Sequence, residues 1–111
     1  MKTSDRIEAY NKNNPGYNIT GIKKMDLESI EARRKYGARS LEDLYIRPSD
    51  AKRSSYNYIL KTYAPADIIA LAGSCRQYSV LLKAGNGDIL HITRANTYLI
   101  DVEDARPIDL M

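Results

Sequence analysis

A change of hydrophobic periodicity near residue 64 constrains the fold of this chain more than any other feature. The chain then has four short runs rich in Ile, Val, Leu, Tyr and Thr, and Gly, Asn and Ser separate the runs. Such runs indicate β-strands, and their close spacing favours antiparallel pairing between neighbours. We therefore predict an antiparallel β-meander of three to four strands, with strands at 67–73, 77–84, 88–94 and 97–103.

The residues before this point contain the start and stop signals of helices. Asp5 is followed by Glu8 at the spacing of a capping box, in which an acceptor side chain satisfies a free backbone N–H at the helix start. Gly37 stops a second helix, on which Ile30 faces inward. An extended piece is expected at 17–22. We predict about four short helices, which begin near Asp5, Asp26, Ser40 and Ser49.

Helices first and strands after, without alternation, favour an α+β domain over a doubly wound parallel sheet. The length of 111 residues fits one domain. We therefore expect residues 1–111 to be a single domain in which N-terminal helices (1–63) pack on the C-terminal meander (64–111). The N-terminus lacks the apolar core of a signal peptide, and no apolar stretch approaches the roughly 20 residues that cross a bilayer. A soluble, cytoplasmic protein without membrane contact is expected.

The turn at 85–87 permits two registers. A two-residue turn at Asn86 and Gly87 places Leu82 opposite His91, which mixes polar with apolar side chains on one face. A three-residue loop, with Gly87 in the left-handed position of a G1 bulge, places Leu82 opposite Leu90 and makes that face apolar. We prefer the second register, and on the last strand we expect this face to continue with Tyr98, Ile100 and Val102. The other face then carries Ser79, Leu81, Lys83, Ile89, His91 and Thr93.

The net charge of +3 is unevenly distributed. Residues 1–63 have 13 Lys or Arg against 8 Asp or Glu, whereas residues 64–111 have 4 against 6. A basic first half is suited to phosphates or to an acidic protein. The alternative is an ordinary solvated helical surface.

No catalytic or metal-binding motif stands out in the sequence. Cys75 lies beside Arg76, whose guanidinium favours the thiolate, but the only histidine, His91, lies on another predicted strand and gives no evident base. A structural zinc site needs about four Cys or His ligands. The loop at 85–87 leads into a strand, whereas a phosphate loop leads into a helix. We expect no enzyme activity, no metal and no cofactor.

Basic side chains gather at two places in the predicted helical half. One cluster ends the second helix, where cations also stabilise the helix dipole, and the other begins the fourth helix, where cations are slightly unfavourable. Tyrosines lie among these charges and can stack on bases or contact a protein. The predicted partner-binding residues are Arg33, Arg34, Lys35, Arg39, Tyr45, Lys52, Arg53, Tyr58 and Lys61.

All nine aromatic residues are tyrosines. Tyrosine is amphipathic and enriched at protein interfaces, although a core that uses Tyr in place of Phe explains the count equally well. We expect Tyr63, Tyr78 and Tyr98 inside the fold. We expect Tyr36, Tyr45 and Tyr58 on its surface.

The stretch from Tyr63 to Val102, with the segments 63–69, 78–83 and 90–99, resembles small uncharacterised proteins carried by phages and plasmids of bacteria. The resemblance implies a context, because small mobile-element proteins commonly bind and block host machinery, CRISPR effectors included. It carries over no functional residue.

These observations together predict a small non-enzymatic binding protein, from a phage or other mobile element, that inhibits a host defence or nucleic-acid machine by direct binding, as anti-CRISPR proteins do. The alternative is a nucleic-acid-binding protein that uses the basic helical half. The expected partner is a host protein or nucleoprotein complex in the bacterial cytoplasm, with nucleic acid itself as the other possibility. The basic first half argues against an acidic surface that mimics phosphates.

Overall fold

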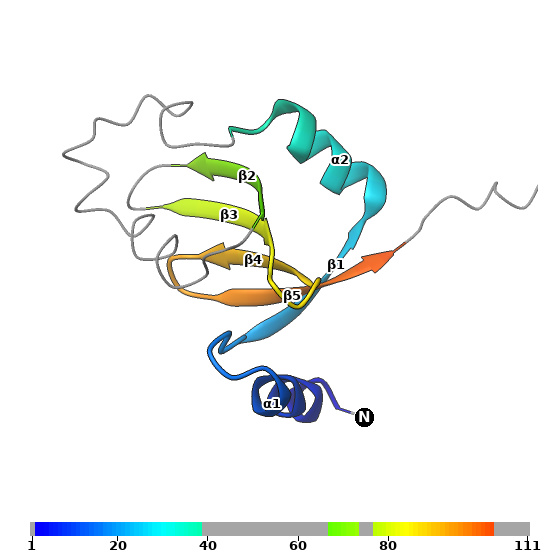
Figure 1. The fold of residues 1–111 in the computed structure, drawn as a ribbon, viewed down its shortest axis with the longest axis vertical. Helices are drawn as coiled ribbons and strands as arrows, with labels where there is room; N and C mark the ends of the chain where they lie inside the picture. The colour runs from blue at the N-terminus through cyan, green and yellow to red at the C-terminus, as the bar shows by residue number, and fades with distance from the viewer. Residues whose placement is uncertain (1, 39–66, 74–76, 104–111) are drawn as a thin grey trace, which may run out of the picture.

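The computed structural model describes residues 2–38, 67–73 and 77–103, which form two helices and one five-stranded sheet (Figure 1). In chain order the elements are α1 (Thr3–Asn13), β1 (Gly21–Asp26), α2 (Leu27–Tyr36), β2 (Asp67–Gly73), β3 (Tyr78–Lys83), β4 (Ile89–Thr93) and β5 (Thr97–Glu103). The strand order is β1-β5-β4-β3-β2. β1 runs parallel to β5, and all other neighbours are antiparallel, so the sheet is mixed.

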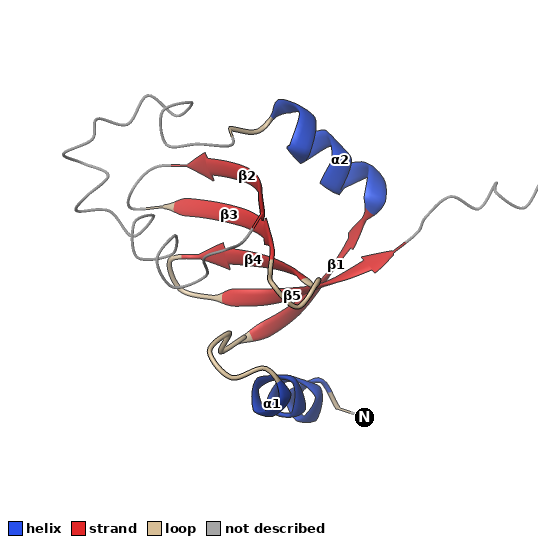
Figure 2. Cartoon of the chain, in the orientation of Figure 1, coloured by secondary structure: helices blue, strands red, loops and turns tan. Residues whose placement is uncertain are grey.

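The predicted α+β class is confirmed, but its details differ. Strands β2 to β5 lie at the predicted places and form the antiparallel part of the sheet. The fifth strand, β1, lies within the half predicted to be helical, and its parallel pairing makes a purely antiparallel meander wrong as a description of the whole sheet. The described residues contain two helices, and the predicted helices from Ser40 and Ser49 lie outside them. Figure 2 shows the strands as one layer with a helix on either side.

Helix α1 begins earlier than predicted. Its N-cap is Lys2, which makes no side-chain capping hydrogen bond, so the predicted capping box of Asp5 and Glu8 is wrong. Asp5 instead lies in the first turn, where the negative charge of an acidic side chain interacts favourably with the helix dipole and stabilises the helix. Ile7 and Tyr10 form the apolar side of the helix, and both pack against the sheet.

The chain turns back after α1 through a reciprocal hydrogen-bond pair. The Asn11 side chain donates to the Ile19 carbonyl at 3.0 Å and accepts from the Ile19 N–H at 2.7 Å. Gly16, with φ +101°, and Asn18, with φ 50°, supply the left-handed residues that the turn requires. Ile19 is thereby buried, and the chain enters β1 beside β5.

Helix α2 follows β1 directly and agrees with the prediction at both ends. The Asp26 side chain accepts from the Ser29 N–H at 2.7 Å, which satisfies a free donor of the first turn. Gly37 ends the helix, and a Cβ there would lie 2.7 Å from Ala70 Cβ, so the chain passes close to β2. Since α2 contacts β1 and β2, it spans the sheet from one edge to the other. Neither described helix has the length and apolar run that a bilayer crossing requires.

The β3–β4 hairpin has the predicted register. Leu82 pairs with Leu90 and Val80 with Ile92. Gly87 has φ +93°, and its N–H donates to the Ala84 carbonyl at 2.9 Å, which closes the three-residue loop. The preference for a uniform apolar face therefore selected the correct register.

Both faces of the sheet are covered, which changes the prediction for β5. On the α1 face, Val80, Leu82 and Leu90 pack with Leu99. On the α2 face, Leu81 and Ile100 pack with Ile30 of α2. Because His91 pairs with Tyr98 and Leu90 with Leu99, the prediction that Tyr98, Ile100 and Val102 continue the α1 face is wrong. Tyr78 is buried as expected, Tyr98 is half-buried and Val102 is 43% exposed.

Candidate functional site

Three of the predicted partner-binding residues are described by the structure, and they lie together. Arg33, Arg34 and Lys35 occupy the last turn of α2 and are all exposed. We call these three residues the basic end of α2. The other predicted residues lie outside the described ranges: Arg39, Tyr45, Lys52, Arg53, Tyr58 and Lys61.

No acidic side chain of the described residues forms an ion pair with the basic end of α2. Within the described ranges, Arg33 and Arg34 form no ion pair with a carboxylate. The Lys35 ammonium lies 5.3 Å from the ring centroid of Tyr36, which is 79% exposed and was expected on the surface. A cation that packs on an aromatic ring keeps its charge available to solvent. This helix end therefore presents positive charge together with an exposed aromatic ring.

Beneath α2, a polar cluster surrounds His91 on β4. The imidazole is 7% exposed, and its ring centroid lies 6.0 Å from that of Tyr98. Lys23 Nζ lies 3.1 Å from His91 Nδ1 and 4.3 Å from the centroid of the Tyr98 ring. Ser79 Oγ lies 2.6 Å from His91 Nε2. Strands β1, β3, β4 and β5 thus each contribute one side chain to the cluster.

The chemistry of Lys23 determines which nitrogen of His91 carries the proton. An ammonium group can only donate, so Nδ1 accepts from Lys23. A neutral imidazole then carries its proton on Nε2 and donates to Ser79 Oγ. A serine nucleophile requires the opposite arrangement, in which the histidine accepts the hydroxyl proton. The Ser79–His91 pair is therefore not arranged to activate Ser79.

The electrostatic environment of His91 is positive. Burial, followed by the charges of Lys23 and Arg33, lowers the pKa of His91 from 6.5 to about 4. Arg33 belongs to the basic end of α2, so the charge of this helix end acts on the buried cluster around His91. At neutral pH the imidazole is uncharged, and the two cations account for the charge of this region.

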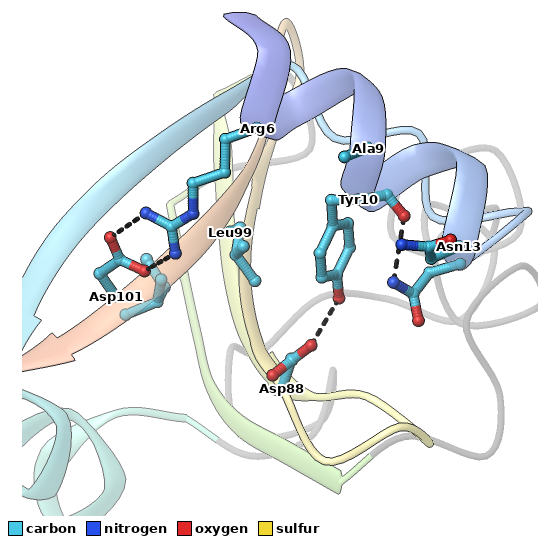
Figure 3. A pocket seen from close by; sticks show the side chains of 9 residues that line it. Arg6, Ala9, Tyr10, Asn13, Asp88, Leu99 and Asp101 are labelled. Atoms are coloured by element: carbon cyan, nitrogen blue, oxygen red, sulfur yellow. Dashed lines mark hydrogen bonds and ion pairs between the residues drawn. The ribbon is translucent and has the colours of Figure 1, made fainter. Parts of the chain in front are cut away.

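A hollow of about 380 Å³ lies on the opposite side of the sheet, between α1 and β5 (Figure 3). The Arg6 guanidinium donates to both carboxylate oxygens of Asp101, and Nη1 lies 2.6 Å from Oδ2. The Tyr10 hydroxyl donates to Asp88 at 2.8 Å and accepts from Asn86 at 2.9 Å. In Figure 3, Arg6 and Tyr10 both point from the helix toward the sheet.

These contacts, which we call the α1 seam, hold α1 against the sheet. Hydrogen bonding to Arg6 lowers the pKa of Asp101, so its carboxylate stays ionised and paired. Burial raises the pKa of Tyr10 to about 12; the hydrogen bond from Asn86 opposes this rise and Asp88 adds to it, so the hydroxyl stays protonated and keeps donating. The charged groups that line the hollow already have partners, which leaves little to recognise a ligand.

The sequence did not point to Lys23. The extended piece expected at 17–22 overlaps only the start of β1 and does not include Lys23. Two consecutive lysines at 23 and 24 obscure the alternation of Ile22 and Met25. Ser79 and His91 were correctly placed on one face, but nothing indicated a partner for either. Cys75 lies outside the described residues, and no group of three or more potential metal ligands occurs among the residues that the structure describes.

The chain has no match among protein-family models, curated proteins or solved structures. The resemblance to small mobile-element proteins thus stays a prediction. The function is therefore inferred from the geometry of the chain itself.

Proposed function

We propose that the protein is a non-enzymatic binding protein that contacts its partner through the basic end of α2, and that this partner is a nucleic acid, free or within a nucleoprotein complex. The observation that carries the proposal is the set of exposed cations without described acidic partners at Arg33, Arg34 and Lys35. Phosphate contacts made by Arg and Lys supply most of the affinity of sequence-independent binding.

The neighbouring aromatic ring supports the same partner. Tyr36 is 79% exposed next to the cations, and an exposed ring can stack on an unpaired base. A helix end with charge and an aromatic side chain fits single-stranded or structured RNA and DNA better than it fits the deep groove of a regular RNA duplex. Inhibition of a host defence or nucleic-acid machine is the biological role in which we place this binding.

The cations at the end of α2 also have a structural explanation, and the binding experiment needs a control for it. Cations in the last turn of a helix stabilise its dipole, whether or not a ligand binds. Lys12 occupies the same position in α1 and is also exposed, but it lies on the α1 side of the sheet. Lys12→Glu therefore has the same helix-dipole cost as Arg34→Glu without a change in the proposed surface.

The test is a titration of the full chain with single-stranded DNA, duplex DNA and structured RNA at several salt concentrations. We expect affinity to fall with salt at a log-log slope of about 0.7 to 0.9 for each phosphate contacted. Arg34→Glu should weaken binding to all sequences alike, whereas Lys12→Glu should leave affinity close to wild type. No binding to any of these nucleic acids, even at low salt, would overturn the proposal.

The second candidate is a protein that blocks a protein surface of a host machine. The exposure of Tyr36 favours it, since tyrosine is enriched among the residues that dominate protein interfaces. In that case the capture of a bacterial protein from a lysate would persist after nuclease treatment. Tyr36→Ala would abolish this capture, while single charge changes at the rim of the interface would weaken it less. Loss of capture after nuclease would instead support nucleic acid.

A further inference from the structure

Lys23 has an unusual environment for a lysine. It is half-buried on the α2 face, with its ammonium 3.1 Å from His91 Nδ1 and 4.3 Å from the Tyr98 ring centroid. No carboxylate of the described segments forms an ion pair with it. The next residue, Lys24, points to the other face of the same strand and pairs with Glu103 at 3.6 Å. Of these two adjacent lysines, Lys24 therefore has a described acidic partner and Lys23 does not.

The described groups around this ammonium and its histidine partner supply no negative charge. β4 contributes the neutral His91, β3 the Ser79 hydroxyl and β5 the Tyr98 ring, and the positive charge of Arg33 on α2 acts on the same imidazole. Withdrawing a charge from water is costly unless it is paired, and a cation–π contact offsets only part of that cost. The Lys23 ammonium retains N–H donors beyond the one directed at His91, and Arg33 makes no side-chain hydrogen bond to a described residue. Two cations with free donors thus act on the same imidazole, and no anion of the described residues lies between them and it.

We propose that Lys23 and Arg33 bind a phosphodiester group of a nucleic-acid backbone on the α2 face, beside His91. This inference rests on the proposed function and deepens it, because it extends the phosphate-binding surface from the helix onto β1. A phosphodiester has two free oxygens, so it can accept from an ammonium and a guanidinium together. Arg34 and Lys35 follow Arg33 on the helix and can contact neighbouring phosphates of the same strand.

His91 reports on this site because it is the only histidine in the chain. Its ring signals in an NMR spectrum are therefore unambiguous. An anion bound between Lys23 and Arg33 would reduce the positive potential at the imidazole, so it would move the ring chemical shifts and raise the pKa of His91. A purely structural role for Lys23 predicts neither change.

The experiment uses the full chain with labelled histidine and a short single-stranded DNA at neutral pH. The expected result is a saturable shift of the His91 ring signals, which a strand with uncharged methylphosphonate linkages does not produce. Lys23→Gln should remove the ring shift and lower the log-log salt slope of binding by about one. Lys24→Gln removes the same charge from the opposite face of β1 and should alter neither readout.

Each other outcome counts against the inference in a distinct way. If the DNA binds with the wild-type salt slope in Lys23→Gln and the His91 signals stay still, the site is wrong while the proposed function stands on Arg34 and Lys35. If inorganic phosphate at matched ionic strength shifts His91 but DNA does not, the site takes a free phosphate and the phosphodiester assignment fails. If no nucleic acid binds at all, both proposals fail. Should Lys23→Gln not fold, Arg33→Gln, on the exposed helix surface, provides the same test.

Discussion

Replacement of His91 should remove a loss of stability that the wild-type protein shows as the pH falls from about 6.5 to 4. Burial first, and then the charges of Lys23 and Arg33, lower the pKa of His91 from 6.5 to about 4. In the unfolded chain the imidazole binds a proton at its ordinary pKa, whereas the folded protein keeps it neutral until about pH 4. The unfolded state binds more protons in this window, so the free energy of unfolding is complete above the window and declines as the pH is lowered through it.

The size of the effect follows from the pKa shift. At about 1.4 kcal/mol for each pKa unit, the shift sets an upper limit of roughly 3 kcal/mol. Between about pH 7 and pH 4.5 the expected loss is about 2 kcal/mol. For a domain of this size, that loss lowers the urea midpoint by roughly 1–2 M.

The assay is urea unfolding, followed by circular dichroism at a series of pH values, for the wild type and His91→Leu. The carboxyl groups of Asp26 and Asp101 do not interfere, because hydrogen bonds from the Ser29 backbone and from Arg6 hold each pKa below the ordinary 3.8. Their contributions are lost only at lower pH. Parallel pH dependence in the two proteins would refute the reasoning. If His91→Leu does not fold, Lys23→Gln keeps the imidazole and should reduce the slope by removing one of its charged neighbours.

Three further predictions concern the hairpin, the α1 seam and the cysteine. Gly87→Ala should cost about 1 kcal/mol in thermal unfolding, and because a Cβ there meets nothing within 4 Å, the whole cost is backbone strain. Gly85→Ala in the same loop should not be destabilising, and equal stability of the two variants would contradict the loop geometry. Tyr10→Phe should cost about 1 kcal/mol at neutral pH, since it removes the hydroxyl between Asp88 and Asn86. Since the pKa of Tyr10 is raised from 10 to about 12, its contribution should be lost as the pH rises through that range, and ultraviolet titration that shows every tyrosine ionising near 10 would contradict this. Cys75→Ser should keep both the fold and the binding, and loss of binding by a folded variant would restore the idea of a reactive thiol.

Features encoded by adjacent residues were predictable from the sequence. The hairpin register followed from the turn and the spacing of apolar residues around Gly87, and α2 followed from Asp26 as acceptor and Gly37 as stop. Arg33, Arg34 and Lys35 were correctly placed at the end of this helix, and all three are exposed. In each case the determining contacts lie within a few residues along the chain.

Features that depend on distant contacts were not predictable. β1 pairs with β5, which lies more than 70 residues away, and a short strand with two central lysines has no alternation that would mark it. The prediction for the face of β5 was wrong because both faces of the sheet are covered, not one. With α1 and α2 on opposite sides, consecutive residues Val80, Leu81 and Leu82 are all buried, so alternation no longer distinguishes inside from outside.

The two covered faces differ in how their charges are satisfied, and this difference is the reason for proposing the α2 face as the binding side. On the α1 face, Arg6 has Asp101 and Lys24 has Glu103. On the α2 face, the described cations Lys23 and Arg33 face a neutral imidazole and an aromatic ring instead of an acid. An acidic residue at position 79 or 98 would stabilise the fold by pairing with Lys23, as Glu103 pairs with Lys24. Folding stability alone therefore does not explain the neutral residues at these two positions. Positive charge without a described counter-ion costs stability, and proteins tend to retain such costs at functional sites, which supports the proposed phosphate contact.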